Sequence, residues 1–343
     1  MTKKLYKLFL ILFSLASCTH NLKIRGETIK NPYIIKDYFH TSDGEKLKLK
    51  LWHSKKSSEI IIIGVHGYSD YSNSFSLPAN FFSKFKIDFY SFDLRGFGSH
   101  KNKGLWYSLE NHILDLKEFY EVIREKNPKK KIFLLGESMG GAIIAGTLNK
   151  FNLKVDGIIL VSPAIWDFSD RNFFKSRFLW ILAKFFPRII LNGKGIIKIK
   201  PSNNKVMLKR FSEDPLVVHK PRADSLFGIT KLMDKTYNMF TSLFSNSNVR
   251  IFLAIPLKDE VIPRKPIIKL LENVIIRDQI YKGIINLSLY ENNFHMILRD
   301  LNREKVTSDI KDWILEHKYE NLENTSRENI EKLKNYKFFH LLD

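Results

Sequence analysis

The chain has only one cysteine, Cys18, among its 343 residues. One thiol leaves no pair for an internal disulfide, and the sequence shows neither a cysteine pair nor an H-E-x-x-H pattern that would mark a metal site. We therefore expect no disulfide framework, no metal and no cofactor. A Gly/Ser-rich linker and internal repeats are also lacking. Nothing in the composition divides the globular part of the chain into separate units.

Acidic residues are the scarcer charged type, because 36 Asp and Glu stand against 56 Lys and Arg and give a formal net charge of +20. Such a balance is informative about partners rather than about fold. The lysines are scattered through the chain without a concentrated arm, and no nucleic-acid-binding motif is present. We therefore expect no nucleic-acid partner. Attraction to acidic membrane head groups accounts for the charge equally well.

The apolar run at residues 8–17 is too short to span a bilayer comfortably, and it follows the basic segment Met1–Lys7. This arrangement is typical of a secretory signal. The run ends in Leu15-Ala16-Ser17-Cys18, which resembles the lipobox of bacterial lipoproteins. In that motif the signal is removed and the cysteine becomes the lipidated first residue.

From this resemblance we predict a signal peptide at 1–17, lipidation of Cys18 and a linker at 18–32. The protein would then be a lipoprotein anchored to a bacterial membrane and exported to its periplasmic or outer side. An uncleaved membrane anchor and a non-lipidated signal are the alternatives. The sequence does not indicate an oligomeric state.

The chain has enough apolar residues, 44% of the total, to bury one large core. Strand-like segments at 33–40 and 46–52 are followed by alternating strands and helices. This order predicts the α/β class, with a mostly parallel central sheet that begins antiparallel and is flanked by helices. The segment 108–125 has apolar residues at helical spacing, which is typical of a surface helix packed on such a sheet.

The hexapeptide Gly136–Gly141, GESMGG, follows the apolar run Lys131–Leu135 and precedes a helix-like stretch that begins at Ala142. The G-x-S-x-G turn needs glycine at both flanks, because the backbone bends too tightly for neighbouring Cβ atoms while it projects Ser138 above the sheet edge. A helix behind the serine favours an anionic intermediate through its N–H groups and dipole. The pentapeptide alone can occur by chance, but the flanking strand and helix favour Ser138 as a nucleophile.

A serine hydroxyl is a weak nucleophile near neutral pH, so it needs a histidine base and an orienting acid, in the chain order Ser, Asp or Glu, His. A strand-like run ending at Ile255 leads into Asp259, and the next strand leads into His295. Both residues would lie at the carboxyl edge of a parallel sheet, where such sites are built. We predict the triad Ser138, Asp259 and His295. Glu260 is a rival for the acid, but the shorter carboxylate is the commoner choice.

The apolar strand Ile60–Val65 is followed by a His66-Gly67 turn, whose glycine lets the backbone approach a substrate closely. We expect the backbone amides of Tyr68 and Met139 to form an oxyanion hole. His66 is interpreted as a side chain that braces the turn rather than as a catalytic group.

A long insertion without an evident strand follows the sixth predicted strand. We predict a helical cap at 163–239, set into a core made of 33–162 and 240–318, and a charged C-terminal tail at 319–343. The cap is rich in aromatic residues, which either pack its helices together or line a cavity for an acyl chain. Favouring the cavity, we predict these substrate-binding residues: Trp166, Phe168, Phe174 and Phe178. Cations lie between these aromatic residues in the sequence and could place the same face on anionic lipid. They are Lys175, Arg177, Lys184 and Arg188.

In their joint order, these motifs resemble the α/β-hydrolase superfamily, and within it the branch of monoacylglycerol lipases, lysophospholipases and serine aminopeptidase-like hydrolases. The resemblance spans about residues 33–318. The segments that carry it are His66-Gly67, Asp93–Gly98, Gly136–Gly141, Ser162-Pro163, Asp259–Pro263 and Phe294-His295. It implies an α/β-hydrolase fold with a helical cap and a serine hydrolase activity without a cofactor.

Two departures from the family pattern are visible. The turn after Arg95 commonly continues G-x-G-x-S, whereas here Ser99 comes one position early and His100 stands where serine is common. Lys258 precedes the acid at a position where a small residue is frequent. None of these changes removes a catalytic group. Asp93 and Arg95 are interpreted as braces of the loops around the site.

The substrate that best matches an aromatic cap, a lipid anchor and the family resemblance is a monoacylglycerol or a lysophospholipid, cleaved by acyl transfer through Ser138. A peptidase on the same fold is one alternative, and it would need Glu137 or Glu260 to receive a substrate amine. A non-catalytic lipid-binding lipoprotein is the other alternative. The intact triad argues against it, because a pure binder needs none of the three groups.

Overall fold

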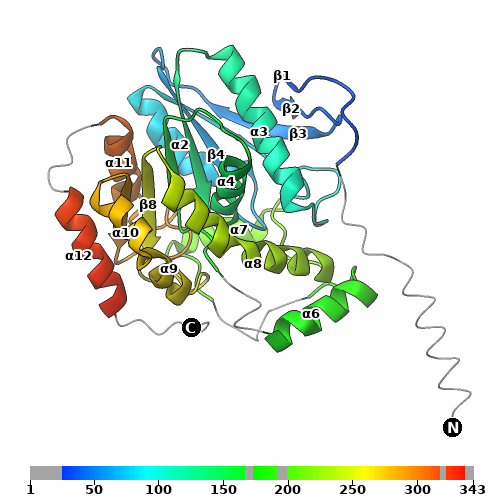
Figure 1. Ribbon diagram of the computed structural model, residues 1–343. Coiled ribbons are helices and arrows are strands. Elements are labelled where there is room, and N and C mark those ends of the chain that lie inside the picture. The colour runs from blue at the N-terminus through cyan, green and yellow to red at the C-terminus, as the bar shows by residue number, and fades with distance from the viewer. Residues whose placement is uncertain (1–24, 167–172, 192–198, 317–321, 337–343) are drawn as a thin grey trace, which may run out of the picture.

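The architecture is visible in a computed structural model of the chain (Figure 1). The residues that it describes are 25–166, 173–191, 199–316 and 322–336. The predicted signal peptide, the lipidation site Cys18 and the substrate-binding candidate Phe168 lie outside them. Within the described ranges, none of the helices combines the length and the apolar character needed to cross a membrane.

The described chain is built on a nine-stranded sheet with the order β1-β2-β3-β5-β4-β6-β7-β8-β9. The strands are β1 (Tyr33–Ile35), β2 (Tyr38–His40), β3 (Lys46–Trp52), β4 (Ile60–Val65), β5 (Ile87–Phe92), β6 (Lys131–Glu137), β7 (Gly157–Val161), β8 (Ile251–Pro256) and β9 (Ile285–Tyr290). The β1–β2, β2–β3 and β3–β5 pairs are antiparallel, and the remaining pairs are parallel. The predicted α/β class, with a mostly parallel sheet and an antiparallel start, is confirmed.

The first predicted strand, 33–40, is divided into β1 and β2 by a tight turn. Lys36 in this turn has a φ of 52°, a left-handed conformation that ends the extended run. The additional strand shifts the count, so the large insertion follows β7 rather than a sixth strand.

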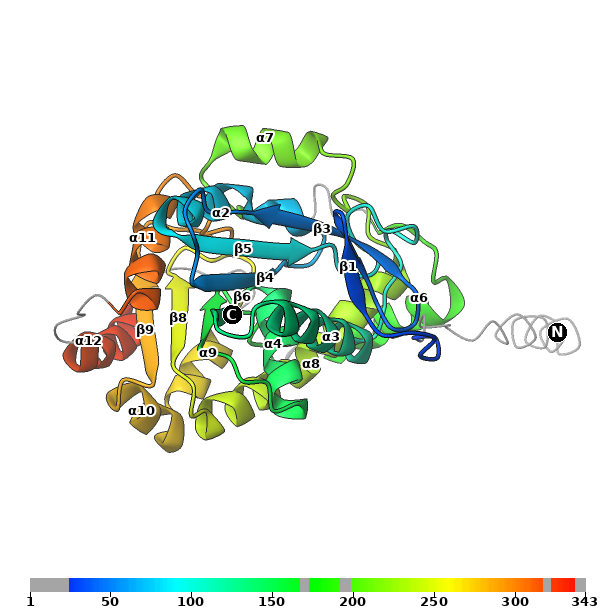
Figure 2. The ribbon, with the colours of Figure 1, turned by 90° about the horizontal axis from the view of Figure 1, so that it is seen from above.

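Helices cover both faces of the sheet, as the view from above shows (Figure 2). The helical segments are η1 (Ser72–Phe75), α2 (Ser76–Phe82), η2 (Ser83–Phe85), α3 (Leu109–Lys126), α4 (Met139–Lys150), α6 (Phe173–Phe185), α7 (Lys205–Glu213), α8 (Ala223–Asn246), α9 (Arg264–Leu271), α10 (Val274–Tyr281), α11 (Arg303–Ile314) and α12 (Leu322–Asn335). Buried side chains of α3, α4, α8, α9, α10 and α12 form the core on one face. Those of α2 and α11 form the core on the other face.

The central strands are apolar throughout because both of their faces are buried. In β4, Ile61 and Ile63 point into the core under α3 and α4, whereas Ile62 points into the core under α2 and α11. All three side chains are fully buried. Strands of this kind are held in register by two cores at once, which fixes the loops at their carboxyl ends.

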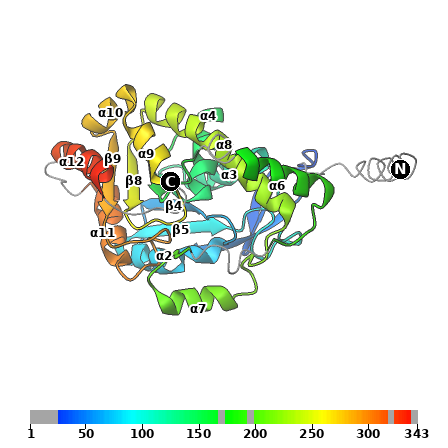
Figure 3. The same ribbon diagram turned by 90° about the horizontal axis from the view of Figure 1, so that it is seen from below.

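The insertion between β7 and β8 carries α6, α7 and α8. Helix α8 packs against α4 and contributes Phe240 and Phe244 to the main core, so it belongs to the helical layer of the hydrolase core. The predicted cap boundary at residue 239 therefore differs from the structure, because it falls inside a continuous helix. Helix α6 lies along α8 (Figure 3), while α7 lies beside α2.

Within the predicted charged tail, residues 322–335 form helix α12, which packs on the core. Ile330 and Leu333 of α12 are buried against the main core beside β9. Asn329 Nδ2 donates a hydrogen bond of 2.8 Å to the backbone oxygen of Leu287 in β9. Helix α12 thus covers the edge strand, and the core extends into the predicted tail.

Candidate active site

Ser138 stands at a sharp turn between β6 and α4, as the sequence predicts. Its φ is 53°, a strained left-handed value for a residue with a side chain. The flanking glycines explain how the turn is possible, since a Cβ on Gly140 would lie 1.9 Å from the Val65 carbonyl oxygen and one on Gly136 would lie 2.5 Å from the Gly141 nitrogen. Helix α4 begins at the next residue, Met139.

Asp259 and His295 come together from the loops after β8 and β9. His295 Nδ1–H donates a 2.9 Å hydrogen bond to Asp259 Oδ2, and both residues are buried. The other carboxylate oxygen, Oδ1, accepts bonds from the amides of Val261 and Ile262 at 2.7 and 3.0 Å. The carboxylate is therefore fixed, and it orients the imidazole with Nδ1 turned away from the reacting side.

The rival acid Glu260 is directed elsewhere. Its Oε2 accepts a 2.7 Å hydrogen bond from the amide of Lys200, in the segment that leads to α7. Of the two neighbouring carboxylates, Asp259 is the one that contacts His295.

The surroundings of His295 raise the pKa of its imidazole. Burial disfavours the charged imidazole, but the adjacent Asp259 carboxylate outweighs this effect, so the pKa of His295 is raised above its usual value. Glu137 also raises it, and Arg299 opposes the rise. A base of higher pKa accepts a proton more readily, provided that it is neutral at the working pH.

Ser162, at the end of β7, connects the serine turn to the histidine loop. Its φ is 45°, and its hydroxyl donates a 2.8 Å hydrogen bond to the His295 carbonyl oxygen. The Ser138 carbonyl oxygen accepts bonds from the amides of Gly141 and Ala164 at 3.0 and 3.2 Å. The carboxyl ends of four adjacent strands, β6 to β9, thereby hold the three predicted triad residues at one edge of the sheet.

The predicted oxyanion amides flank the serine turn. Gly67 lies so close that a Cβ on it would be 3.4 Å from Ser138 Cβ. Within the described chain, the amides of Tyr68 and Met139 donate no backbone hydrogen bond outside regular secondary structure, which leaves them available for a substrate oxygen. The Tyr68 hydroxyl is 2.9 Å from Ser225 Oγ of α8, so the side chain is directed away from the serine turn.

His66 is a brace, as predicted. It is fully buried, its Nδ1–H donates to the Gly67 carbonyl oxygen at 2.8 Å, and its Nε2 accepts from the Leu94 amide at 3.0 Å. Burial lowers the pKa of His66 and so favours the neutral ring that this pair of bonds requires.

Asp93 and Arg95 also brace loops. The two oxygens of Asp93 accept bonds from Ser72 and from Ser99, so the serine that comes early in this sequence caps the same aspartate. Arg95 is buried and binds both Asp43 and Asp115. His100, which stands where serine is common in the family, is also buried, and its Nδ1 accepts bonds from the amides of Gly96 and Asn102 at 3.2 Å.

The predicted substrate-binding residues of the cap are not gathered in a cavity. Trp166 is buried in the main core, where its amide and carbonyl groups bond to Thr236 Oγ1 of α8. Phe174 and Phe178 are 85% and 63% exposed on the outer side of α6. Helix α6 packs against α8, and among its described side chains the small residues Ser176 and Ala183 are the buried ones, so the predicted acyl-cavity role of the two phenylalanines stays a prediction that their exposure does not support.

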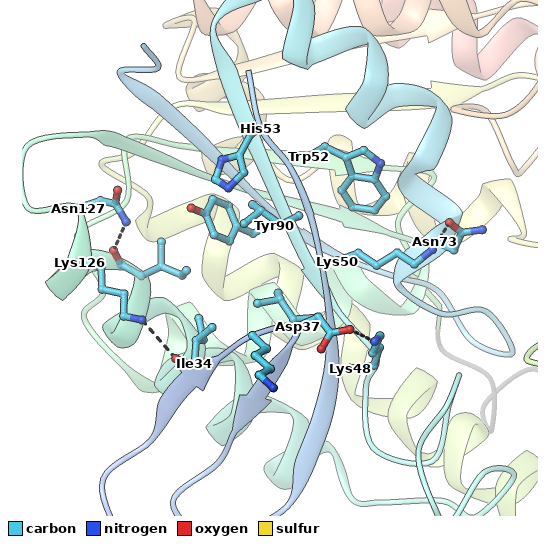
Figure 4. Close-up of a pocket in the computed structure, with 14 residues that line it drawn as sticks. Ile34, Asp37, Lys48, Lys50, Trp52, His53, Asn73, Tyr90, Lys126 and Asn127 are labelled. Atoms are coloured by element: carbon cyan, nitrogen blue, oxygen red, sulfur yellow. Dashed lines mark hydrogen bonds and ion pairs between the residues drawn. The ribbon is translucent and has the colours of Figure 1, made fainter. Parts of the chain in front are cut away.

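A groove of about 630 Å³ lies at the opposite side of the sheet from these loops, and none of the predicted site residues lines it (Figure 4). It runs beside β3 between the β1–β2 turn and the end of α3. Four lysines line it together with two aromatic residues: Lys36, Lys48, Lys50, Lys126, Trp52 and Tyr90. The described residues include no group of three or more His, Cys, Asp or Glu side chains placed to hold a metal ion.

Sequence reasoning missed Arg299. This arginine follows His295 by four residues, and its buried guanidinium contacts Asp70 and Glu137. No spacing rule links positions 70, 137 and 299, because they come from two loops and the end of β6, far apart in the sequence. Only an unusual arginine within the histidine loop could have drawn attention to it.

Known proteins that resemble this chain are hydrolases of related description. Residues 56–302 match the family described as "Serine aminopeptidase, S33". The chain is 21% identical to a monoacylglycerol lipase of Mycolicibacterium smegmatis, over 80% of this chain and 94% of the relative. It is 22% identical to a monoglyceride lipase of Rattus norvegicus, over 82% of this chain and 91% of the relative.

Solved structures agree on the fold. A soluble variant of monoglyceride lipase from Saccharomyces cerevisiae, in complex with a substrate analog, has a TM-score of 0.68 at 19% identity and covers 86% of this chain and 98% of its own. The monoacylglycerol lipase of Paleococcus ferrophilus has a TM-score of 0.64 at 20% identity and covers 79% and 99%. The fold is that of the α/β hydrolases.

Proposed function

This chain belongs to the serine aminopeptidase family of α/β hydrolases, and on that premise we propose that it is a serine ester hydrolase that cleaves the acyl ester of a monoacylglycerol or lysophospholipid. The single observation that carries the proposal is the buried 2.9 Å contact between His295 Nδ1 and Asp259 Oδ2, at the same sheet edge as the strained Ser138 turn. Nucleophilic catalysis by serine requires a histidine that a carboxylate orients in this way.

The first half of the reaction transfers the acyl group to the enzyme. His295 takes the proton from Ser138 Oγ as that oxygen attacks the ester carbonyl carbon, and the resulting imidazolium is stabilised by Asp259. The amides of Tyr68 and Met139 bind the negative oxygen that forms. Collapse of this intermediate expels the glycerol oxygen, which takes the proton from His295.

The second half releases the acid. His295 removes a proton from water, and the hydroxide attacks the acyl-enzyme carbonyl. The Ser138 oxygen then leaves with the proton that His295 returns. No group other than the triad, the two amides and water is needed to balance these steps.

The substrate class is supported by the relatives. The two curated relatives described above are named monoacylglycerol lipase and monoglyceride lipase, and the chain covers more than nine-tenths of each. A lysophospholipid presents the same single acyl ester on a glycerol backbone, so it fits the same chemistry. An ester of an amphiphile also suits an enzyme that works at a membrane surface.

The peptidase alternative finds less support in the geometry. It needs a carboxylate that can receive a substrate amine. Glu137 faces the buried Arg299, and Glu260 accepts the Lys200 amide, so each candidate acid already has a partner. Ester hydrolysis requires neither carboxylate as a receptor for an amine.

Membrane attachment belongs to the same proposal. Phe174 and Phe178 are exposed on α6 beside Arg177 and Lys184, whose charges lie over the Trp180 ring. Aromatic side chains with interleaved cations suit a membrane interface with anionic lipid. A lipid on Cys18 would hold the enzyme at that surface, on the outer side of a bacterial membrane.

The proposal is tested by hydrolysis of p-nitrophenyl esters, monoacylglycerols, lysophospholipids and aminoacyl arylamides by the detergent-solubilised chain and its Ser138→Ala variant. We expect ester cleavage that the variant loses by on the order of 10⁴-fold or more. Cleavage of arylamides alone would establish the peptidase, and lipid retention without any turnover would establish a binder. Lipidation is tested by incorporation of a labelled fatty acid, which Cys18→Ser should abolish.

A further inference from the structure

Arg299 is a buried cation that joins two buried carboxylates. Its Nη2 lies 2.7 Å from Asp70 Oδ2 and 3.3 Å from Glu137 Oε2. The exposed fractions of the three residues are 7%, 4% and 3%. Phe211 of α7 lies beside the guanidinium, with the ring centroid 5.9 Å from Cζ. Water is therefore largely excluded from this cluster, and each charge depends on the others for compensation.

The three residues come from the three segments that carry the proposed chemistry, namely two loops and the end of β6. Asp70 follows the oxyanion amide of Tyr68 by two residues, and Glu137 directly precedes Ser138. Arg299 belongs to the loop that begins with His295, where its amide donates to the Met296 carbonyl oxygen at 2.9 Å. One side chain thus contacts the oxyanion loop and the serine turn from the histidine loop.

The next residue, Asp300, fixes the loop from its other side. Its Oδ2 accepts a 2.6 Å bond from the Phe294 amide, and its Oδ1 accepts bonds from Ser202 Oγ and the Asn203 amide. The backbone that presents Arg299 is therefore held at both ends. A guanidinium on such a support can set the separation of the loops that it contacts.

We propose that Arg299 is a positioning residue for the hydrolysis, which holds the oxyanion loop and the serine turn in register with the loop that carries His295. This inference rests on the proposed serine hydrolase function. Arg299 acts through Asp70 and Glu137 and does not itself touch the reacting atoms. Its ion pairs couple parts of the site that are far apart in sequence.

A role in stability alone does not explain this cluster well. Buried ion pairs seldom stabilise a fold more than apolar residues of similar volume would. Arg299 Nε and Glu137 Oε1 are buried without a hydrogen-bond partner among the described residues. Unpaired buried polar atoms lower the stability of the fold, so the cluster is not arranged for maximum stability. A positioning role explains why the cluster lies between the segments that carry Tyr68, Ser138 and His295.

Charge balance gives the cluster a second effect. Burial raises the pKa of Glu137, and Arg299 opposes that rise and so favours the carboxylate. Burial also disfavours the charged form of Arg299, yet Asp70 and Glu137 together raise its pKa. Without Arg299, the buried Asp70 and Glu137 would lose their compensating charge, and burial would favour the neutral form of Glu137.

The same charges act on His295 in opposite directions. The groups that shift the pKa of His295 are Asp259 and Glu137, which raise it, and Arg299, which lowers it. Removing Arg299 should therefore move the acid limb of the kcat/KM profile to higher pH. Removing the charge of Glu137 should move it to lower pH. A purely structural contact would not produce opposite shifts.

The experiment measures kcat, KM and pH profiles for a soluble short-chain ester with the full chain and with Arg299→Met, Glu137→Gln and Arg303→Met. Arg303 is the matched control, because it lies four residues further on and is partly exposed, and within the described part of the chain its side chain contacts the Asp300 carbonyl oxygen and Glu304. We expect Arg299→Met to lose on the order of 100-fold in kcat with a smaller change in KM. Arg303→Met should resemble the wild type.

The outcomes separate this inference from the proposed function. If the wild type shows no hydrolysis that depends on Ser138, the function itself fails. If the wild type is active and Arg299→Met matches Arg303→Met in kcat and pH profile, the positioning role is overturned. Should Arg299→Met not fold, Glu137→Gln decides the question, because it keeps the shape of the side chain. A downward shift of its acid limb with reduced kcat supports the role, and an unchanged profile overturns it.

Discussion

Asp259 and His295 are separated by 36 positions in the sequence, yet Oδ2 of the first and Nδ1 of the second are 2.9 Å apart in a buried contact. The contact fixes the tautomer that leaves Nε2 able to accept a proton. It also provides the main influence that raises the pKa of His295 against the effect of burial. The pair is the structural centre of the proposed mechanism.

Replacing Asp259 by Asn should lower kcat by about 10⁴-fold, because an amide no longer stabilises the imidazolium and favours the wrong tautomer. Loss of the carboxylate also lowers the pKa of His295, so the acid limb of the residual kcat/KM profile should move to lower pH. Stopped assays with a p-nitrophenyl ester from about pH 4 to about pH 9 measure both the fall in kcat and the shift of the acid limb. Glu260→Gln is the control and should stay active; loss of activity in the control instead would reverse the assignment of the acid.

Replacing Gly140 by Ala should destroy the serine turn. The added Cβ would lie 1.9 Å from the Val65 carbonyl oxygen, and backbone cannot move aside cheaply. We expect a loss of about 1–3 kcal/mol or more in the free energy of unfolding, measured in urea, together with the loss of ester hydrolysis. Gly283→Ala is the control without a clash, because its Cβ would meet no atom within 4 Å, and although Gly283 has a φ of 72° this variant should keep its activity. Equal behaviour of the two variants would contradict the crowding argument.

Helix α12 should contribute to the stability of the whole enzyme. Leu333 is 1% exposed, so Leu333→Ala should lower the free energy of unfolding by about 2–5 kcal/mol through lost burial and a residual cavity. Leu301, which is 61% exposed, provides the control, and Leu301→Ala should be close to neutral. Chemical denaturation monitored by tryptophan fluorescence measures both. If the two variants are equally stable, α12 does not form part of the core.

The exposed face of α6 should bind membranes. The double variant Phe174→Ser, Phe178→Ser should bind vesicles containing anionic lipid at least roughly tenfold more weakly, because each phenylalanine loses apolar surface that the membrane would bury. Hydrolysis of a soluble short-chain ester should be unchanged. Val274→Ser, on exposed α10, is the control for any loss of surface hydrophobicity. Co-sedimentation at low and high salt separates the apolar and charged contributions, since only the charged one is screened.

The fold and the order of the triad could be predicted from the sequence because both are encoded locally. A strand buried on both faces reads as an apolar run, and a turn as tight as the one at Ser138 tolerates only glycine at its flanks. The interpretation of His66 as a brace was also local, since it rested on the position of this residue in a short turn before Gly67. Predicted roles for Ser138, Tyr68 and Met139 await the experiments above.

The orientation of α6 could not be predicted. Its aromatic residues and its small residues both recur at helical spacing, so the pattern does not say which stripe faces inward. Tertiary packing decided it, because Ser176 and Ala183 are the buried positions on a helix that packs against α8. The same limit applies to α12, whose mixed charges do not distinguish a packed helix from a loose appendage, and among its described side chains Ile330 and Leu333 are the buried apolar ones.

What the sequence by itself determined is the set of chemical groups and their order along the strands, because backbone geometry and periodicity act over a few residues. What only the tertiary structure decided is which distant side chains meet. The partnership of Arg299 with Asp70 and Glu137 joins two loops and the end of β6, and each acid could have found another cation in so basic a chain. That choice depends on the exclusion of water at one place in the folded molecule, which no local pattern records.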